Sequence, residues 1–543
     1  MSVYYYLSNK VFFKNLTHAL FAGLFTRVFF LAAVCLFFLL SCNRSQQSLA
    51  LRYSNGAEPE SLDPHQATGQ PGIRVIGALF EGLLLRKGTE LEPGLAKSWE
   101  LSADQKTYHF HLRKAKWSDN TFISAQDFVY SWQRLALPQT AAQYSMLLQN
   151  IKNAPQVLSG TFPPESLGVH APNESTLVVE LSTPTPYFLH LVAFEPLFPV
   201  PKKCIETHGP KWTKPENMIN NGPFKIVSWK PNQKIELKRN PLYWDVQNVK
   251  QELIEVYPIE HLETAYKMYL SGELDWLFAL PLGRMQESKK RSDYFNATQY
   301  GLYYYALNMT QPELQSPLLR RALALSINRE ELVEAVVQGG EKAAYTLVPP
   351  NSNPGYPQLS GSSYNPKLAQ KLLAQDGYGP NKALPRLQIY YNTSEAHKKI
   401  AEVVAASWKK HLNIETDLQN HEWKIYLQNT HQKKYQIARA SWIGDYPDPY
   451  TFLELFESKN GNNRTGYNNQ AFDSCLKLAQ QEVEPTLRLQ KLASCEELLL
   501  TDLPFIPLYF YAQNEMRSPK LRGAETSPLG MYSWKHVHLS TNP

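Results

Sequence analysis

The 543-residue sequence lacks the short motifs of the common hydrolases and nucleotide-binding enzymes. It has no G-x-S-x-G nucleophile turn, no H-E-x-x-H zinc motif and no G-x-x-x-x-G-K-[ST] phosphate loop. The pair His421-Glu422 is followed by Ile425, where a zinc protease needs its second histidine. We therefore predict that the protein is not an enzyme, and we assign it no catalytic residue and no cofactor.

Cysteine is scarce, with five in the chain, and no two of them form a C-x-x-C pair. This absence excludes a thioredoxin-type redox site and a zinc ribbon. Two His-x-His pairs occur, His109 with His111 and His536 with His538, but no carboxylate or cysteine accompanies either pair. Two imidazoles alone make a poor metal site, so we predict no metal.

A large excess of positive charge is also missing. The 55 Lys and Arg residues against 49 Asp and Glu residues leave a net charge of +6, and the first 41 residues supply half of it. The remainder is too small for a polyanion-binding surface. With 43% hydrophobic and 19% charged residues, the chain is not a disordered one either. These figures exclude a nucleic-acid partner and a disordered scaffold, and the length predicts two or more lobes.

The one long apolar run lies near the N-terminus. Phe29 to Leu40 reads FFLAAVCLFFLL, and Arg27 with two lysines precedes it. A basic flank and an apolar stretch this short are typical of a secretory signal peptide, since a spanning helix needs about 20 apolar residues. The run ends in Leu-Leu-Ser-Cys at residues 39–42, which resembles a bacterial lipobox. We predict a lipoprotein signal peptide over 1–41, lipidation at Cys42 and a tether over 42–50; an ordinary leader or a retained anchor are the alternatives.

Three cysteines remain in the mature chain, Cys204, Cys475 and Cys495. Export permits disulfides. Cys475 and Cys495 pair if they face each other across a helical hairpin, and one cysteine is left over in any case.

The hydrophobic pattern predicts mixed strands and helices. Residues 107–113 alternate as a half-buried strand, and 253–257 form a short strand followed by a helical pattern from Leu262 to Tyr269. Residues 387–391 form a strand, Ile400, Val403, Val404 and Trp408 share a helix face, and 412–418 alternate again. Strand–helix–strand order indicates an α/β lobe.

The segment ARASWIGDYPDP, residues 438–449, brings a cation, an indole and a carboxylate together beside a glycine and two prolines. In a dry cleft, Asp445 suits an ammonium group and Arg439 suits a carboxylate, since unpaired buried charges are costly. That pairing fits a zwitterion such as a peptide or an amino acid. The alternative is an internal Arg–Asp ion pair in a surface loop.

From about residue 51 to 540 the chain resembles the oligopeptide-binding lipoproteins of peptide ABC importers, within the peptide/nickel extracellular solute-binding family. The resemblance rests on the order and spacing of the segments GAEPESLDPH (56–65), LFEGLL (79–84), PGLAKSWE (93–100), FHLRKAKWSDNTFISAQDFVYSWQR (110–134), NGPF (221–224), SGELD (271–275), YNTSEAHKK (391–399), EWKIYLQNTHQKKYQIARASWIGDYPDP (422–449) and IPLYFY (506–511).

This resemblance implies an α/β, two-lobed periplasmic-binding-protein fold with a hinge and an extra inserted domain. The lobes close on a peptide held as an extended strand by main-chain hydrogen bonds, with its side chains in hydrated pockets. The implied domains are a base domain built from three separate segments (51–79, 204–300 and 513–543), an inserted N-lobe domain (80–203) and a C-lobe domain (301–512).

The resemblance also implies roles for single residues. Asp445 matches the aspartate that binds the peptide's α-ammonium group. Arg439 matches an arginine that, together with a second arginine, binds the C-terminal carboxylate of shorter peptides. His397 matches a histidine that serves longer peptides. The residues that match aromatic groups lining the pocket are Trp442, Trp423, Tyr144 and Tyr511.

Several family positions differ in this chain. The second arginine's position is Thr430, a lysine for very short peptides falls at Val337, and a glutamate near the ammonium end is replaced by Thr68. Two cysteines that form a disulfide in the family fall at Gly301 and Ile443. These departures predict that the site still binds the ammonium group of a peptide but has fewer basic residues to bind its C-terminal carboxylate. Our hypothesis from these substitutions is that the cleft prefers a modified or branched peptide, such as a cell-wall fragment.

The sequence and the resemblance leave three functions open. The first is a monomeric transport receptor in the periplasm, lipid-anchored to a bacterial membrane, which passes short peptides to an inner-membrane ABC permease with its ATPase subunits. The second is the same fold specialised for a murein peptide, a nickel chelate or haem. The third is a secreted hydrolase or a surface interaction protein.

Overall fold

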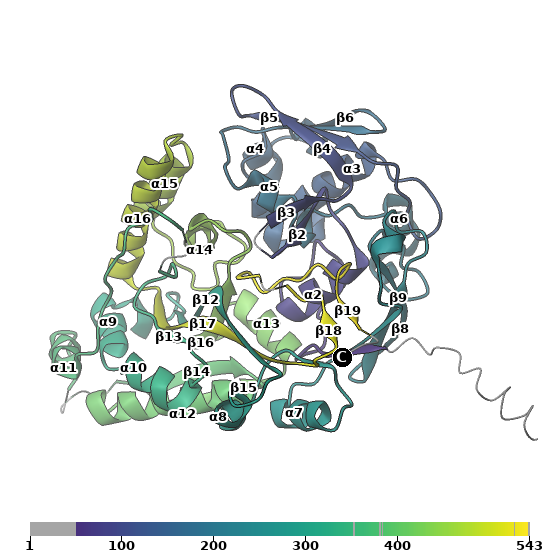
Figure 1. The fold of residues 1–543 in the computed structure, drawn as a ribbon. Helices are drawn as coiled ribbons and strands as arrows, with labels where there is room; N and C mark the ends of the chain where they lie inside the picture. The colour runs from purple at the N-terminus through teal and green to yellow at the C-terminus, as the bar shows by residue number, and fades with distance from the viewer. Residues whose placement is uncertain are drawn as a thin grey trace, which may run out of the picture. The chain divides into compact units, whose positions relative to one another are not determined.

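One mixed β-sheet of eleven strands runs through the described residues of the chain (Figure 1). The computed structural model describes residues 50–88, 90–350, 353–379, 382, 384–525 and 527–540. The predicted signal peptide and the lipid site at Cys42 lie outside these residues. The strands of the sheet lie in the order β15 (Thr416–His421), β14 (Leu387–Asn392), β16 (Ile437–Ile443), β12 (Tyr294–Leu307), β17 (Phe505–Arg517), β11 (Trp276–Leu277), β1 (Leu51–Ser54), β10 (Leu253–Tyr257), β9 (Lys234–Arg239) and β8 (Phe224–Lys230), while β13 (Lys342–Ala343) pairs with β17.

Two long neighbouring strands, β12 and β17, link the two halves of this sheet. Near one end Arg517 of β17 pairs with Trp276 of β11, and at the other end Leu307 of β12 pairs with Ile437 of β16. The β12–β17 register shifts between Thr298 and Leu302, and such irregularities bend and twist a strand pair. We call the half that contains β14, β15 and β16 the C-lobe, and the half that contains β1, β8, β9 and β10 the N-lobe. The predicted two-lobed α/β fold class is confirmed.

The C-lobe contains the predicted strand–helix–strand unit. Strand β14 runs parallel to β15, and α12 (Glu395–Leu412) connects them. Ile400, Val404 and Trp408 are buried on one face of α12, as their spacing predicts. The other helices of this lobe are α9 (Pro317–Leu325), α10 (Arg329–Glu331), α11 (Pro366–Gln375), α13 (Trp423–His431), α14 (Tyr450–Leu453), α15 (Gln470–Gln480) and α16 (Pro485–Asp502).

The prediction that the strand after α12 begins at Leu412 is wrong. Leu412 is the last residue of the helix and continues the buried stripe of Trp408, one turn earlier. Asn413 caps the helix. It has a positive φ of 55°, a conformation that stops helices and that asparagine tolerates. Strand β15 therefore begins only at Thr416.

The N-lobe includes a second, four-stranded antiparallel sheet in the order β4 (Ala96–Leu101), β5 (Thr107–Leu112), β7 (Thr176–Glu180) and β6 (Val169–Asn173). Tyr108, Phe110 and Leu112 of β5 are buried and His109 is exposed, as predicted. No group of three or more His, Cys, Asp or Glu side chains in the described residues is placed to hold a metal ion. The remaining elements of this lobe are α2 (Gln70–Leu79), β2 (Leu84–Lys87), β3 (Glu90–Pro93), α3 (Ala125–Ala136), α4 (Ala154–Leu158), α5 (Phe188–Leu191), α6 (Lys202–His208), α7 (Leu262–Leu270), α8 (Met285–Ser288), β18 (Leu521–Arg522) and β19 (His538–Leu539).

A disulfide joins Cys475 of α15 to Cys495 of α16, with 5.7 Å between the Cα atoms. This confirms that the two cysteines face each other across a helical hairpin. Cys204 keeps a free, buried thiol whose sulfur donates to the carbonyl of Asn217. In the residues described, every helix is too short or too polar to cross a lipid bilayer.

Candidate functional site

Stacked tyrosines lie at the contact between the lobes. Tyr187 of the N-lobe stacks on Tyr446 of the C-lobe with 4.6 Å between ring centroids. Beside them the Gln149 side chain donates to the Tyr450 hydroxyl at 2.7 Å. The loop that follows strand β16 is therefore covered by the N-lobe, and the charged residues predicted from the sequence lie in this strand and loop.

Asp445 is buried in that loop and only 3% exposed. Its backbone N–H donates to the Thr451 hydroxyl at 3.1 Å, and the Tyr144 hydroxyl of the N-lobe donates weakly to Oδ1 at 3.4 Å. The other oxygen, Oδ2, has no hydrogen-bond partner, and Asp445 forms no ion pair within the described residues. Burial raises the pKa of Asp445 well above its ordinary value, against the opposing charge of Arg86. A cation that reached Oδ2 would stabilise the ionised form of Asp445.

Arg86 and Glu195 complete the charges around Asp445, and neither is among the predicted site residues. The guanidinium of Arg86 donates to the backbone carbonyls of Asp445 at 2.6 Å and of His190 at 3.1 Å. It thereby holds the loop through backbone carbonyls rather than through the Asp445 carboxylate. Glu195 is buried, and its Oε2 also has no partner. One sequence signal points to Glu195: it is the single acid in the apolar run FLHLVAFEPLFPV, where an isolated charge is unusual.

The ionisation of Glu195 makes stability depend on pH. Burial raises its pKa to about 7, although the charge of Arg86 lowers it. Because the pKa of Glu195 is higher in the folded state than in the unfolded state, protonation of Glu195 stabilises the fold. This contribution to the unfolding free energy is complete below about pH 4.5 and is lost as pH rises through 7. Between pH 5.5 and 8.5 we expect the wild type to lose about 2 kcal/mol more unfolding free energy than Glu195→Gln. Urea unfolding at both pH values measures this, with the exposed Glu174→Gln as control; equal losses in all three proteins contradict it.

Arg439, six residues before Asp445, is a buried cation that forms no ion pair among the described residues; its side chain is 8% exposed. Its guanidinium donates to the hydroxyl of Tyr511 at 3.0 Å and weakly to Asn392 Oδ1 at 3.4 Å, while Nε has no partner. It also lies over the ring of Tyr303, 4.9 Å from the centroid. An anion would satisfy this group best. At about 3.3 Å per residue the stretch from Arg439 to Asp445 spans at most about 20 Å, which is the reach of a short extended peptide.

His397 lies on the Arg439 side of the site. Its Nδ1 is 3.3 Å from the hydroxyl of Tyr303, and its ring is half-buried. Burial, and then the charge of Arg439, lowers the pKa of His397 well below its ordinary value. Both effects favour the neutral imidazole, which serves as a hydrogen-bonding group.

The predicted aromatic residues divide between these two ends. Tyr144 and Trp442 belong to the Asp445 end, with 6.4 Å between their ring centroids, and Tyr511 belongs to the Arg439 end. Trp423 touches neither charge. It packs against Gly69 of the N-lobe, since a Cβ at Gly69 would lie 2.7 Å from the indole, and it stacks on Tyr426 at 5.8 Å.

The positions that differ from the family also have clear surroundings. Gly301 pairs with Ile443 across strands β12 and β16, and a Cβ on Gly301 would lie 2.4 Å from the Ile443 side chain. The backbone N–H of Thr68 donates to Glu60 at 2.8 Å. Val337 is buried at the end of a π-helical turn over Leu332–Val337.

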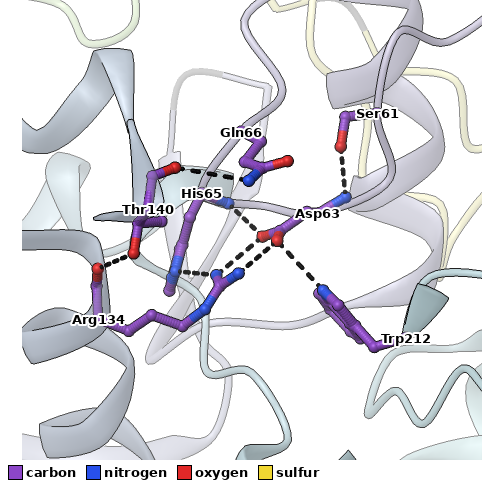
Figure 2. A network of polar contacts seen from close by, with 7 residues as sticks. All are labelled: Ser61, Asp63, His65, Gln66, Arg134, Thr140 and Trp212. Carbon is purple, nitrogen blue, oxygen red and sulfur yellow. Dashed lines mark hydrogen bonds and ion pairs between the residues drawn. The ribbon is translucent and has the colours of Figure 1, made fainter. Parts of the chain in front are cut away.

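A second polar cluster lies in the N-lobe (Figure 2). It lines an open groove of about 1270 Å³, which Lys424 of the C-lobe helix α13 also lines. Arg134 forms an ion pair with Asp63 at 2.6 Å, and Trp212 donates to the same carboxylate at 3.1 Å. Arg134 also lies 2.6 Å from Nδ1 of His65, whose pKa burial lowers to about 3. Because both charges are already paired, this cluster holds the 61–66 segment onto α3. None of the predicted site residues lines the groove.

Two lobes that bury an aspartate and an arginine without ion-pair partners, on one strand and the loop that follows it, are the arrangement of a solute-binding protein. The sequence model of the bacterial extracellular solute-binding proteins, family 5, matches residues 90–464. The chain belongs to this family, which consists of binding proteins rather than enzymes.

Individual relatives cover nearly the whole described chain. The periplasmic oligopeptide-binding protein of Salmonella typhimurium is 38% identical over 490 residues, which is 87% of this chain and 88% of the relative. The structure resembles that of the Haemophilus influenzae oligopeptide-binding protein in complex with the peptide RPPGFSPFR, with a TM-score of 0.88, 33% identity and coverage of 91% and 99% of the two chains.

The Escherichia coli murein tripeptide-binding protein resembles this chain equally well. One of its structures has a TM-score of 0.88 at 36% identity, with coverage of 91% and 99%. A second, described as the unliganded open form, has a TM-score of only 0.63 over 91% and 98% of the chains. The arrangement of the lobes here therefore differs from that open form.

Proposed function

We propose that this protein is the substrate-binding component of an ABC importer, which captures short oligopeptides between its lobes and delivers them to a membrane permease. The observation that carries the proposal is the buried Asp445 carboxylate with its unpartnered Oδ2, on the same strand-and-loop segment as the unpaired Arg439 guanidinium. Opposite unpaired charges at this spacing match the two termini of a zwitterionic peptide. Binding through termini and backbone, rather than through side chains, makes selection of peptide sequence weak.

The oligopeptide-binding relatives support this proposal, and the murein tripeptide-binding relative supports a second candidate ligand. Identity to the two kinds of relative is the same, 38% in each case, so overall similarity does not separate them. Both ligands carry a free ammonium group and fit Asp445. Competition between trialanine and murein tripeptide for one site decides which is preferred.

The cellular setting belongs to the same proposal. The protein is exported, is lipidated at Cys42 and works in the periplasm as a monomer tethered to a bacterial membrane. Its partners are short peptides and an inner-membrane permease with ATPase subunits. The periplasmic location named for the relatives and the leader that ends in Leu-Leu-Ser-Cys support this setting.

Native mass spectrometry tests the function directly. The protein is expressed without residues 1–41, purified without refolding, weighed with its bound ligand and then denatured to release that ligand. We expect a mixture of peptides of two to five residues, and this mixture should be absent from Asp445→Ala. A single discrete species favours a specialised ligand, whereas release of no peptide contradicts the proposal.

A further inference from the structure

Arg464 is a half-buried arginine to which neither the sequence motifs nor the family resemblance assigns a role. A guanidinium has five N–H donors, yet Arg464 makes one side-chain hydrogen bond, from Nη1 to the Thr430 hydroxyl at 3.4 Å. In the chain as described it forms no ion pair with Asp or Glu. The side chain is thus a partly desolvated cation whose donors are largely uncommitted.

The loop that carries Arg464 is held rigidly on both sides of it. Asn463 donates to the carbonyl of Tyr467 at 2.8 Å, and the Thr465 hydroxyl donates to Asn463 Oδ1 at 2.9 Å. The segment that follows strand β12 is connected to the loop, because the N–H of Met309 donates to the Thr465 carbonyl at 2.8 Å. The carbonyl of Arg464 itself accepts from the Tyr435 hydroxyl at 2.6 Å. Such a fixed backbone aims the side chain and lowers the entropy lost on binding a ligand.

Helix α13 contacts both the Arg464 side chain and the backbone of Arg439. Thr430 lies four residues after Tyr426, so the two side chains share a face of the helix. The hydroxyl of Tyr426 donates to the backbone carbonyl of Arg439, while Thr430 accepts from Arg464. The guanidinium of Arg464 and the backbone of Arg439 therefore contact the same face of α13.

The charge of Arg464 also reaches the ammonium end of the site. Burial and the neighbouring Asp445 raise the pKa of Tyr144 well above its ordinary value, and Arg464 acts in the opposite direction. Burial also raises the pKa values of Tyr304 and Tyr426, and the charges of Arg439 and Arg464 both lower them. Arg464 thus lies within electrostatic range of the tyrosine that binds Asp445 and of the tyrosines around Arg439.

We infer that Arg464 is a binding residue of the cleft, which together with Arg439 holds the C-terminal carboxylate of a short peptide. The inference rests on the proposed function and adds a residue to its site. It reverses the expectation that the site has fewer basic residues for the C-terminal carboxylate. Thr430 has no charge, but its short side chain leaves room for the guanidinium of Arg464 from the neighbouring loop. An uncapped peptide is then preferred over one whose C-terminus is an amide.

Calorimetric titration of the leaderless protein with trialanine and with trialanine amide tests this. We expect the wild type to prefer the free acid. Arg464→Gln should weaken binding of the acid by about tenfold, the effect of one charged hydrogen bond, and change binding of the amide little. The matched control is Arg386→Gln, because Arg386 is exposed and paired with Asp417; it should leave both affinities unchanged.

A double variant moves the cation to the opposite side of the contact. Thr430→Arg combined with Arg464→Thr should restore the preference for the free acid that Arg464→Gln loses. If Arg464→Gln weakens the acid and the amide equally, or neither of them, the inference is wrong while the proposed function stands. If the wild type binds neither peptide, the proposed function falls and the inference falls with it. Circular dichroism of each variant separates loss of binding from loss of fold.

Discussion

Replacing Asp445 by asparagine is expected to weaken binding of a peptide with a free amino terminus by about 100-fold or more, because removal of one partner of a buried charge pair costs several kcal/mol. The substitution keeps the shape of the side chain and removes only its charge. Since Oδ2 has no partner in the protein itself, the unfolding free energy should stay the same or rise. Calorimetric titration with trialanine and urea unfolding measure the two effects.

The ligand supplies the control for this prediction. N-acetyl-trialanine has no ammonium group, so the wild type should bind it as weakly as Asp445→Asn binds trialanine, and the variant should lose little further affinity for it. Asp417→Asn, a change of the same kind at a half-exposed residue outside the site, should bind trialanine normally. If Asp445→Asn binds trialanine as tightly as the wild type, Asp445 is not the ammonium partner.

The largest effect on stability is expected from Arg488, which anchors the loop that carries Asp445. Arg488 and Asp448 form a two-pronged ion pair, with distances of 2.7 and 3.0 Å and side-chain exposures of 6% and 10%. Arg488→Met would leave the Asp448 carboxylate buried without a cation. We expect the unfolding free energy to fall by about 3–5 kcal/mol, measured by urea unfolding at pH 7.

Two further variants show whether burial is the cause. Arg386→Met removes an arginine from an exposed ion pair with Asp417, where solvent screens the charges, and should cause no measurable loss. Arg488→Met combined with Asp448→Leu replaces the buried pair by apolar groups and should regain much of the stability. A loss at Arg488 no greater than that at Arg386 would contradict the prediction.

Elements with strong local periodicity could be predicted from the sequence. Strand β5 and helix α12 follow patterns of two and of three to four residues, which report directly which face is buried. The prediction fails at Leu412, because this residue fits both the buried face of the helix and the alternating pattern of the strand that follows. There, the left-handed conformation of Asn413 decides where the helix ends.

The candidate site was predictable only to a limited extent. Asp445, Trp442 and Arg439 lie within seven residues, so their combination is visible in the sequence, and the resemblance to the family adds Tyr144, His397 and Tyr511. The resemblance does not reveal that burial lowers the pKa of His397, because desolvation depends on the side chains that surround this residue. The same holds for Arg464, whose relation to Thr430 exists only once α13 and the 463–467 loop are packed.

The sequence by itself determined the α/β class, the family and the candidate acidic and basic residues, because these depend on residue types and short spacings. Only the tertiary structure decided which charges are paired. Arg86 and Tyr144 meet Asp445 across 359 and 301 residues of chain, and no local pattern encodes a contact at that separation. The physical reason is that a carboxylate or guanidinium acquires its role from the partners that folding brings to it or leaves out. Arg488 is paired with Asp448, whereas Asp445 Oδ2 and Arg439 Nε have no hydrogen-bond partner in the described protein.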